Sequence, residues 1–123
     1  EILIVDDSPF FRHLLSPLLQ QAGYAVTSVD SAEHALELKD GGKHFDLIVS
    51  DIDMPGMDGY AFAEAVKSSA EWADTPLVAL SGNTSGDWVE RSRDVGFSDY
   101  VGKTDREGLL HTLSTTLGAG AGR

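Results

Sequence analysis

Short apolar runs alternate along this chain with longer segments of helical periodicity. Three runs are apolar almost without interruption, as strands buried on both faces of a sheet are: residues 2–5, 47–50 and 77–80. Two other segments, 25–29 and 99–101, are more polar or shorter, and we expect them at the sheet edges. Strands that alternate with helices predict a parallel sheet covered on both faces. The predicted architecture is a doubly wound α/β fold with strand order 2-1-3-4-5 and five helices.

Capping and helix-breaking residues indicate where the helices begin and end. Ser8 is a suitable cap for the first helix, Pro9 suits its first turn, and Gly23 ends it. The remaining helices are expected to begin at Ser31, at Asp58, near residue 84 and at Asp105.

The first helix carries an apolar stripe that we centre on Phe10, Leu14 and Leu18. This assignment places Phe10 and Leu14 in the core. Phe11 and Leu15 would then form an exposed apolar patch suited to a helical partner, with burial of Phe11 as the alternative. Of the two tryptophans, Trp72 is expected to cover an edge of the sheet and Trp88 to lie on the fourth helix.

Length and charge narrow the classes of function. The 123 residues suffice for one domain, which we assign to 1–117, followed by a flexible tail at 118–123. A net charge of -11 disfavours binding to nucleic acid or to anionic membranes. The chain has no cysteine, which fits a cytoplasmic protein. It begins at a strand without Met, so we expect it to be part of a longer chain.

Polar residues follow four of the predicted strands at the points where the strands end. They are Asp6 and Asp7, Asp51, Ser81 and Lys103. In an open parallel sheet the carboxyl ends of the strands form one crevice, where ligands bind. Carboxylates, a hydroxyl and an ammonium group together suit a Mg²⁺-dependent reaction on a phosphoryl group.

Each of these residues also has an ordinary structural interpretation. Asp6 and Asp7 repel each other unless a cation joins them, but they could be solvated loop residues. Asp51 could be a nucleophile that forms an acyl phosphate, or a cap for the next loop. Lys103 could neutralise phosphoryl oxygens or be a surface lysine. Their joint position at strand ends favours the functional interpretation.

The sequence resembles the response-regulator receiver domains of two-component signalling over nearly its whole length. The resemblance is carried by Asp6-Asp7, by Asp51-Ile52-Asp53-Met54-Pro55-Gly56-Met57-Asp58-Gly59, by Thr75-Pro76-Leu77-Val78-Ala79-Leu80-Ser81-Gly82, and by Asp99-Tyr100-Val101-Gly102-Lys103. It implies a flavodoxin-like fold and a signalling domain that is not a classical enzyme, although it catalyses its own phosphorylation and dephosphorylation. Its implied partner is a histidine kinase or a histidine phosphotransfer domain.

The resemblance also assigns roles to single residues. Asp51 would be the phosphorylated residue, and Mg²⁺ would be bound by Asp7, Asp51 and the main-chain carbonyl of Asp53, with Asp6 acting through a water molecule. Ser81 would bind the phosphoryl group and Lys103 would pair with it. Ser81 and Tyr100 would form the switch that changes the surface around helix 4, strand 5 and helix 5.

Two segments are more narrowly similar to receivers fused to chemotaxis-type hybrid histidine kinases: Ser8-Pro9-Phe10-Phe11-Arg12 and Lys103-Thr104-Asp105-Arg106-Glu107-Gly108-Leu109. Most receivers have a cis proline after the lysine, where this chain has Thr104. A cis bond before a residue other than proline costs about 2.5–4 kcal/mol, so we expect a trans peptide here.

Other functions fit the pattern less well. Asp51-Ile52-Asp53 is similar to the motif of aspartate-nucleophile phosphatases, but those enzymes carry it on the first strand. A flavodoxin-type cofactor site needs a phosphate loop after the first strand, where Asp6-Asp7 would repel the phosphate. A receiver-like interaction module that is never phosphorylated remains the main alternative.

Overall fold

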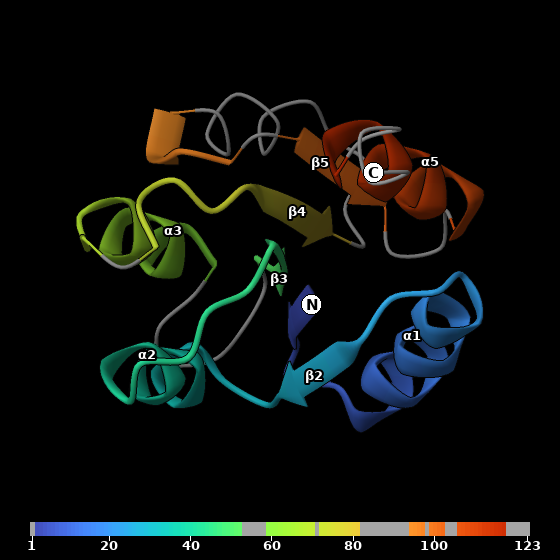
Figure 1. Cartoon of the computed structure of the whole chain (residues 1–123), viewed down its shortest axis with the longest axis horizontal. Helices are drawn as coiled ribbons and strands as arrows, with labels where there is room; N and C mark the ends of the chain where they lie inside the picture. Colours follow the sequence, from blue (N-terminus) through green and yellow to red (C-terminus); the bar gives the residue numbers. More distant parts are fainter. Residues whose placement is uncertain are drawn as a thin grey trace.

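The structure is a computed structural model, and it describes residues 2–52, 59–70, 72–81, 94–97, 99–102 and 106–117, with the backbone alone for Ser81, Arg106 and Leu117. Within these residues one parallel sheet lies between two layers of helices (Figure 1). The strands are β1 Ile2–Val5, β2 Val26–Val29, β3 Leu47–Asp51, β4 Leu77–Ser81 and β5 Asp99–Gly102. The helices are α1 Pro9–Gln21, α2 Ala32–Asp40, α3 Gly59–Lys67 and α5 Arg106–Leu117.

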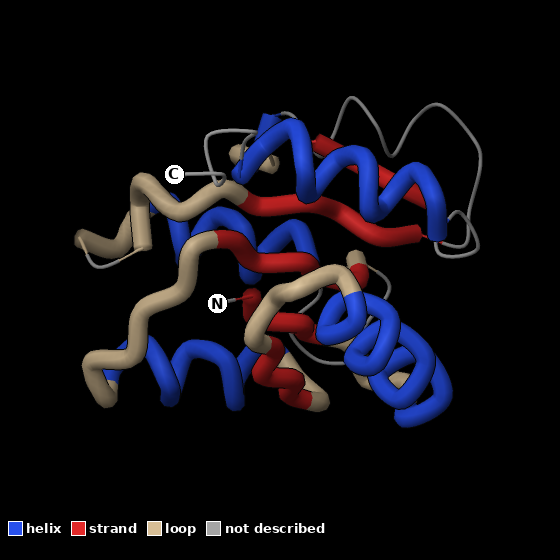
Figure 2. The backbone as a smooth tube through the Cα atoms, turned by 45° about the vertical axis from the view of Figure 1, so that its right-hand side comes forward, coloured by secondary structure: helices blue, strands red, loops and turns tan. Residues whose placement is uncertain are grey.

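The strand order is β2-β1-β3-β4-β5, and every neighbouring pair is parallel. Figure 2 shows the strands stacked side by side with helices on either face. The predicted order and the flavodoxin-like architecture are therefore confirmed. Because the order reverses between β1 and β3, the crevice expected for a ligand lies at the carboxyl ends of these two strands.

The sheet buries both of its faces, so its strands show period-2 alternation between two apolar clusters. Leu3 and Val5 face one cluster, which is completed by α2, α3 and Trp72. Ile2 and Ile4 face the other, which is completed by α1 and α5. The four side chains of β1 are fully buried, which fixes the register of the strand that leads into Asp6 and Asp7.

The helix caps follow the sequence pattern. The Ser8 hydroxyl accepts a hydrogen bond from the Phe11 amide at 3.4 Å, and the Ser31 hydroxyl accepts one from the His34 amide at 3.1 Å. Gly23 follows α1 with φ +100°, where a side chain would be strained. Helix α3 ends at Lys67.

The predicted buried face of α1 is wrong. Leu15 and Leu19 are 1% and 0% exposed, whereas Phe10 is 69% exposed. Leu14 and Phe11 are half-buried. Large apolar residues spread over about half of the circumference of this helix, so periodicity alone does not locate the centre of the buried stripe. Leu15 and Leu19 pack in the cluster that contains Ile2 and Ile4. Phe10, in the first turn of the helix, stays exposed to solvent.

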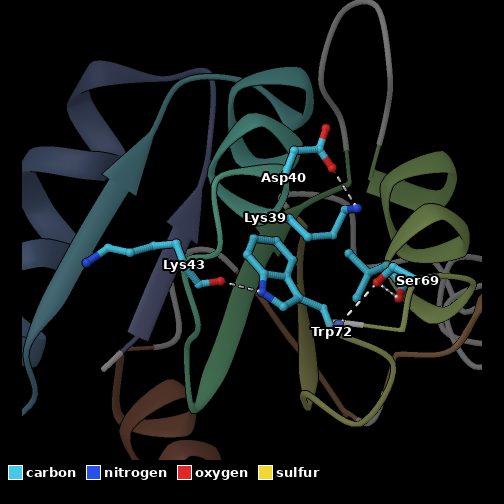
Figure 3. A network of polar contacts seen from close by, with 6 residues as sticks. Lys39, Asp40, Lys43, Ser69 and Trp72 are labelled. Atoms are coloured by element: carbon cyan, nitrogen blue, oxygen red, sulfur yellow. Dashed lines mark hydrogen bonds and ion pairs between the residues drawn. The ribbon is translucent and has the colours of Figure 1, made fainter.

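Trp72 is a core residue, which corrects its expected position at a sheet edge. It is 0% exposed and packs edge-to-face on Phe45 at a centroid distance of 5.8 Å. Its indole Nε1 donates to the main-chain oxygen of Lys43 at 2.9 Å, and its amide donates to the Ser69 hydroxyl at 3.1 Å (Figure 3). Because Phe45 and Lys43 immediately precede β3, Trp72 closes the amino end of the central strands.

The fourth predicted helix lies mostly outside the described residues, although residues 94 and 95 are helical. The expected helix starts at Asp58 and Asp105, the peptide between Lys103 and Thr104, Trp88 and the tail at 118–123 also lie outside them.

Candidate functional site

Three carboxylates meet at the carboxyl ends of β1 and β3. These strands pair in parallel, with Val5 beside Ser50, so the residues that follow lie next to each other. Each of Asp6, Asp7 and Asp51 offers a carboxylate oxygen, and these three oxygens lie within 4.8 Å of one another. The structure thus brings together three of the four predicted metal-binding residues.

The three acids differ in burial. Asp6 and Asp51 are 0% exposed, whereas Asp7 is exposed. Moving carboxylates out of water is costly unless a cation or hydrogen-bond donors compensate their charge. A set of oxygen ligands with one open side suits a hard cation such as Mg²⁺, which keeps several waters or substrate oxygens in its shell. The donor set therefore fits the predicted metal.

The turn that carries Asp6 and Asp7 is held by local hydrogen bonds. The Ser8 amide donates to Asp6 Oδ1 at 2.9 Å. Arg12 Nη1 donates to the main-chain oxygen of Asp6 at 2.8 Å, and the Asp6 amide donates to the Val29 oxygen at 3.1 Å. The end of β1, the neighbouring strand β2 and the start of α1 together fix this turn.

Asp51 is placed by the middle of the sheet and by the start of α3. Its Cα partner on β4 is Leu80, and the Ile52 amide donates to the Leu80 oxygen at 3.1 Å. The Gly59 amide donates to the Ile52 oxygen at 3.3 Å, so α3 begins directly against the end of β3. This use of Gly59 was not predicted, and its only sequence signal was its place in the motif that follows Asp51.

Of the other candidates, Ser81 lies at the same carboxyl end of the sheet, whereas Tyr100 lies within β5. Ser81 pairs with Gly102 at the ends of β4 and β5, and Tyr100 pairs with Ala79. Tyr100 is half-buried and packs against the cluster on the α2 and α3 face. Asp53 and Lys103, and the side chain of Ser81, lie outside the described residues.

The first turn of α1, which follows Asp7 closely in the chain, carries an aromatic pair of exposed Phe10 and half-buried Phe11. Phe10 and Phe11, in the first turn of α1, contact each other edge-to-face with ring centroids 5.4 Å apart. Phe10 is the one large hydrophobic side chain found strongly exposed among the described residues. No helix in the described part of the chain is long and apolar enough to cross a membrane.

Comparison with known proteins places this geometry in a family. Residues 2–114 match the model of the response regulator receiver domain. The rice (Oryza sativa subsp. indica) two-component response regulator ORR3 is 36% identical over 105 residues, covering 85% of this chain and 80% of that protein.

Solved structures agree with the family match. The Vibrio cholerae chemotaxis protein CheY4 is similar with a TM-score of 0.86 and 35% identity, over 94% of this chain and 96% of that chain. The receiver domain of the sensor histidine kinase PA1611 from Pseudomonas aeruginosa PAO1, solved with magnesium coordinated in its active-site cleft, has a TM-score of 0.85 and 26% identity, over 94% and 95% of the two chains. With its 2-1-3-4-5 sheet and its acidic cluster at the strand ends, this chain belongs to the response regulator receiver domain family.

Proposed function

We propose that this domain accepts a phosphoryl group from a phosphohistidine onto Asp51 in a Mg²⁺-dependent reaction. The observation that carries the proposal is the cluster of Asp6, Asp7 and Asp51 at the switch point of the sheet, with Asp51 fully buried at its base. A carboxylate in this position can attack phosphorus, since forming an acyl phosphate is an established role of aspartate.

The phosphoryl group would pass from the imidazole of the donor to Asp51. An Asp51 carboxylate oxygen forms the new O–P bond as the N–P bond of the donor breaks, and the electron pair of that bond returns to the imidazole. Ser81 donates its hydroxyl hydrogen to a phosphoryl oxygen, and the Lys103 ammonium pairs with another. Asp7, Asp51 and the carbonyl of Asp53 would hold Mg²⁺, with Asp6 acting through water. The ion supplies neutralisation of the charge on the transferring group.

The aromatic pair of Phe10 and Phe11 supports a helical donor as partner. Phe10 and Phe11 stand three and four residues after Asp7, in the first turn of α1, where the exposed Phe10 offers apolar surface. A histidine kinase or histidine phosphotransfer domain could pack a helix there while its phosphohistidine enters the cluster. This pair replaces the patch of Phe11 and Leu15 expected from the sequence, because Leu15 is buried.

The output signal would be transmitted by the surface around helix 4, β5 and α5. Movement of Ser81 toward the phosphoryl group would make room for Tyr100, and the surface around helix 4, β5 and α5 would rearrange. A cytoplasmic setting belongs to the same proposal. The similarity to chemotaxis-type hybrid kinases remains a prediction.

Intact mass spectrometry tests the phosphoacceptor role. The wild-type domain is incubated with Mg²⁺ and acetyl phosphate, beside Asp51→Asn and the control Asp30→Asn. Asp30 is an exposed acid that directly follows β2 and therefore lies at the same end of the sheet. We expect one phosphate adduct in the wild type and in Asp30→Asn, and none in Asp51→Asn. An unphosphorylated wild type would favour the interaction-module alternative, and an adduct that persists in Asp51→Asn would exclude Asp51 as the acceptor.

A further inference from the structure

Arg12 is bonded to the peptide that joins two of the clustered acids. Its Nη1 donates to the main-chain oxygen of Asp6 at 2.8 Å, and that oxygen belongs to the peptide between Asp6 and Asp7. The Arg12 side chain is half-buried. A fixed cationic donor therefore holds the backbone between two carboxylates that lie within 4.8 Å of Asp51.

The start of α1 explains how Arg12 reaches this peptide. Long side chains on a helix point back toward its amino end, which brings the guanidinium from the first turns of α1 to the end of β1. The Arg12 amide donates to the Ser8 oxygen at 3.1 Å, and the Ser8 amide donates to Asp6 Oδ1 at 2.9 Å. Arg12, Ser8 and Asp6 thus form one connected set of hydrogen bonds around the turn.

We propose that Arg12 is a positioning residue for the metal site, which keeps the Asp6–Asp7 peptide oriented so that the Asp7 carboxylate faces Asp51. The inference rests on the proposed function, because it concerns Mg²⁺ binding by these acids. Arg12 does not contact the ion in this proposal. It acts through the main-chain oxygen of Asp6, as outer groups that orient metal ligands do.

Positioning and charge make opposite predictions for the removal of Arg12. If Arg12 acted only through its charge, its loss would make the cluster more negative and Mg²⁺ would bind more tightly. If Arg12 orients the peptide, its loss lets the turn relax and Mg²⁺ binds more weakly. The direction of the change in affinity therefore separates the two roles.

Titration calorimetry with Mg²⁺ alone measures that direction in four proteins: wild type, Arg12→Met, Arg12→Lys and Lys43→Met. Arg12→Lys keeps the charge and one donor. Lys43→Met changes the net charge as Arg12→Met does, at an exposed position that precedes the opposite end of the sheet. About 0.3 M salt limits long-range charge effects. We expect about tenfold weaker binding in Arg12→Met, from the usual effect of removing an outer group, and affinities near wild type in the other two variants.

Unchanged or tighter Mg²⁺ binding in Arg12→Met would overturn the proposal, as would a loss in Arg12→Lys as large as that in Arg12→Met. If Arg12→Met does not fold, Arg12→Gln takes its place, because the glutamine side chain is too short to reach the main-chain oxygen of Asp6.

A second readout does not depend on the metal. In the metal-free protein, exchange of the Ser8 amide should be faster in Arg12→Met than in Lys43→Met, since Arg12 and Ser8 hold the same turn. Equal exchange rates would contradict the positioning role. A wild type that binds no Mg²⁺ would instead refute the metal in the proposed function, and the exchange rates would still decide whether Arg12 holds the turn.

Discussion

The backbone of Gly59 lies directly against the backbone of Asp51. A Cβ atom on Gly59 would be 2.5 Å from the main-chain oxygen of Asp51 and 2.4 Å from the Cα of Ile52. Real side chains do not approach backbone atoms so closely, so a larger residue would push α3 away from β3. Glycine is needed here for this close approach, because α3 begins where the proposed phosphoacceptor strand ends.

Gly59→Ala should therefore destabilise the domain and disturb the acceptor. We expect the free energy of unfolding to fall by roughly 1–3 kcal/mol, the usual cost of overpacking, and phosphorylation by acetyl phosphate to slow. Urea denaturation and intact mass measure the two effects. Gly41→Ala is the control, since its Cβ would meet only ordinary contacts of 3.4 Å and 3.5 Å. Equal losses of stability in the two variants would contradict the close-contact argument.

Repulsion within the acidic cluster should lower the stability of the metal-free domain, so removing one of its charges should raise that stability. Asp7 is exposed and Asp6 Oδ1 already accepts the Ser8 amide, so Asp7→Asn removes repulsion without breaking that bond. We expect Asp7→Asn to raise the melting temperature in EDTA by a few degrees and to lose the stabilisation that Mg²⁺ gives the wild type.

Asp6→Asn is the comparison for this experiment. It removes the same charge but weakens the hydrogen bond to Ser8, so its gain in EDTA should be smaller. The cluster assignment would be wrong if Asp7→Asn kept wild-type affinity for Mg²⁺ in titration calorimetry.

The sequence predicted the parts of this domain that depend on local pattern. The uninterrupted apolar runs indicate the central strands, and the more polar or shorter ones the outer strands of the sheet. Asp6, Asp7 and Asp51 meet because each follows such a run and parallel strands have their carboxyl ends on the same side. Ser8 and Gly23 indicate the limits of α1, since caps and left-handed glycines act within one turn.

The errors and omissions concern contacts between distant segments. The buried indole of Trp72 donates its hydrogen bond to the Lys43 oxygen, 29 residues earlier. No local sequence pattern contains this pairing. The burial of Leu15 in place of Phe10 depends on how α1 sits on the sheet. Gly59 was visible as part of a motif, but its contact with Asp51 requires the packed structure.

Lys67 should make the free energy of unfolding depend on pH in the alkaline range. Its Nζ donates to the main-chain oxygens of Ala73 and Thr75 at 3.1 Å and 2.9 Å. Burial lowers the pKa of Lys67 below 10.5, and the charge of Asp74 only partly opposes this shift. Between the lowered pKa and 10.5, Lys67 binds more protons in the unfolded chain than in the folded one. The contribution of Lys67 to the free energy of unfolding therefore grows as pH rises through this range.

The measurement compares unfolding by urea between about pH 8 and pH 10.5 in wild type, Lys67→Met and the exposed control Lys43→Met. At neutral pH Lys67→Met should lose roughly 1 kcal/mol through its missing hydrogen bonds. The advantage of wild type over Lys67→Met should widen with pH, and by more than any change in the difference between wild type and Lys43→Met. A gap that narrows as pH rises would show that the lysine is not disfavoured in its charged form.

The proposed switch should be visible in tryptophan fluorescence. Tyr100 is half-buried against the core cluster that also contains Ala79, its partner on β4, and a shift of Ser81 would give it space to turn inward. We expect beryllofluoride with Mg²⁺, which imitates the phosphoryl group, to change Trp88 emission in wild type and much less in Tyr100→Ala.

Trp72 is the internal reference for this experiment. It is fully buried at the amino end of the sheet, and β3, about 13 Å long, separates it from the acidic cluster. Removing Trp72 would break its hydrogen bond to the Lys43 oxygen, so we keep Trp72 and use Trp88→Phe to isolate the signal of Trp88. Beryllofluoride should leave the emission of Trp88→Phe unchanged. A change in Trp88→Phe as large as in wild type would mean that the response reaches the opposite end of the sheet. Amide exchange that changes only beside Asp51, and not in residues 84–101, would mean that the output leaves by another face.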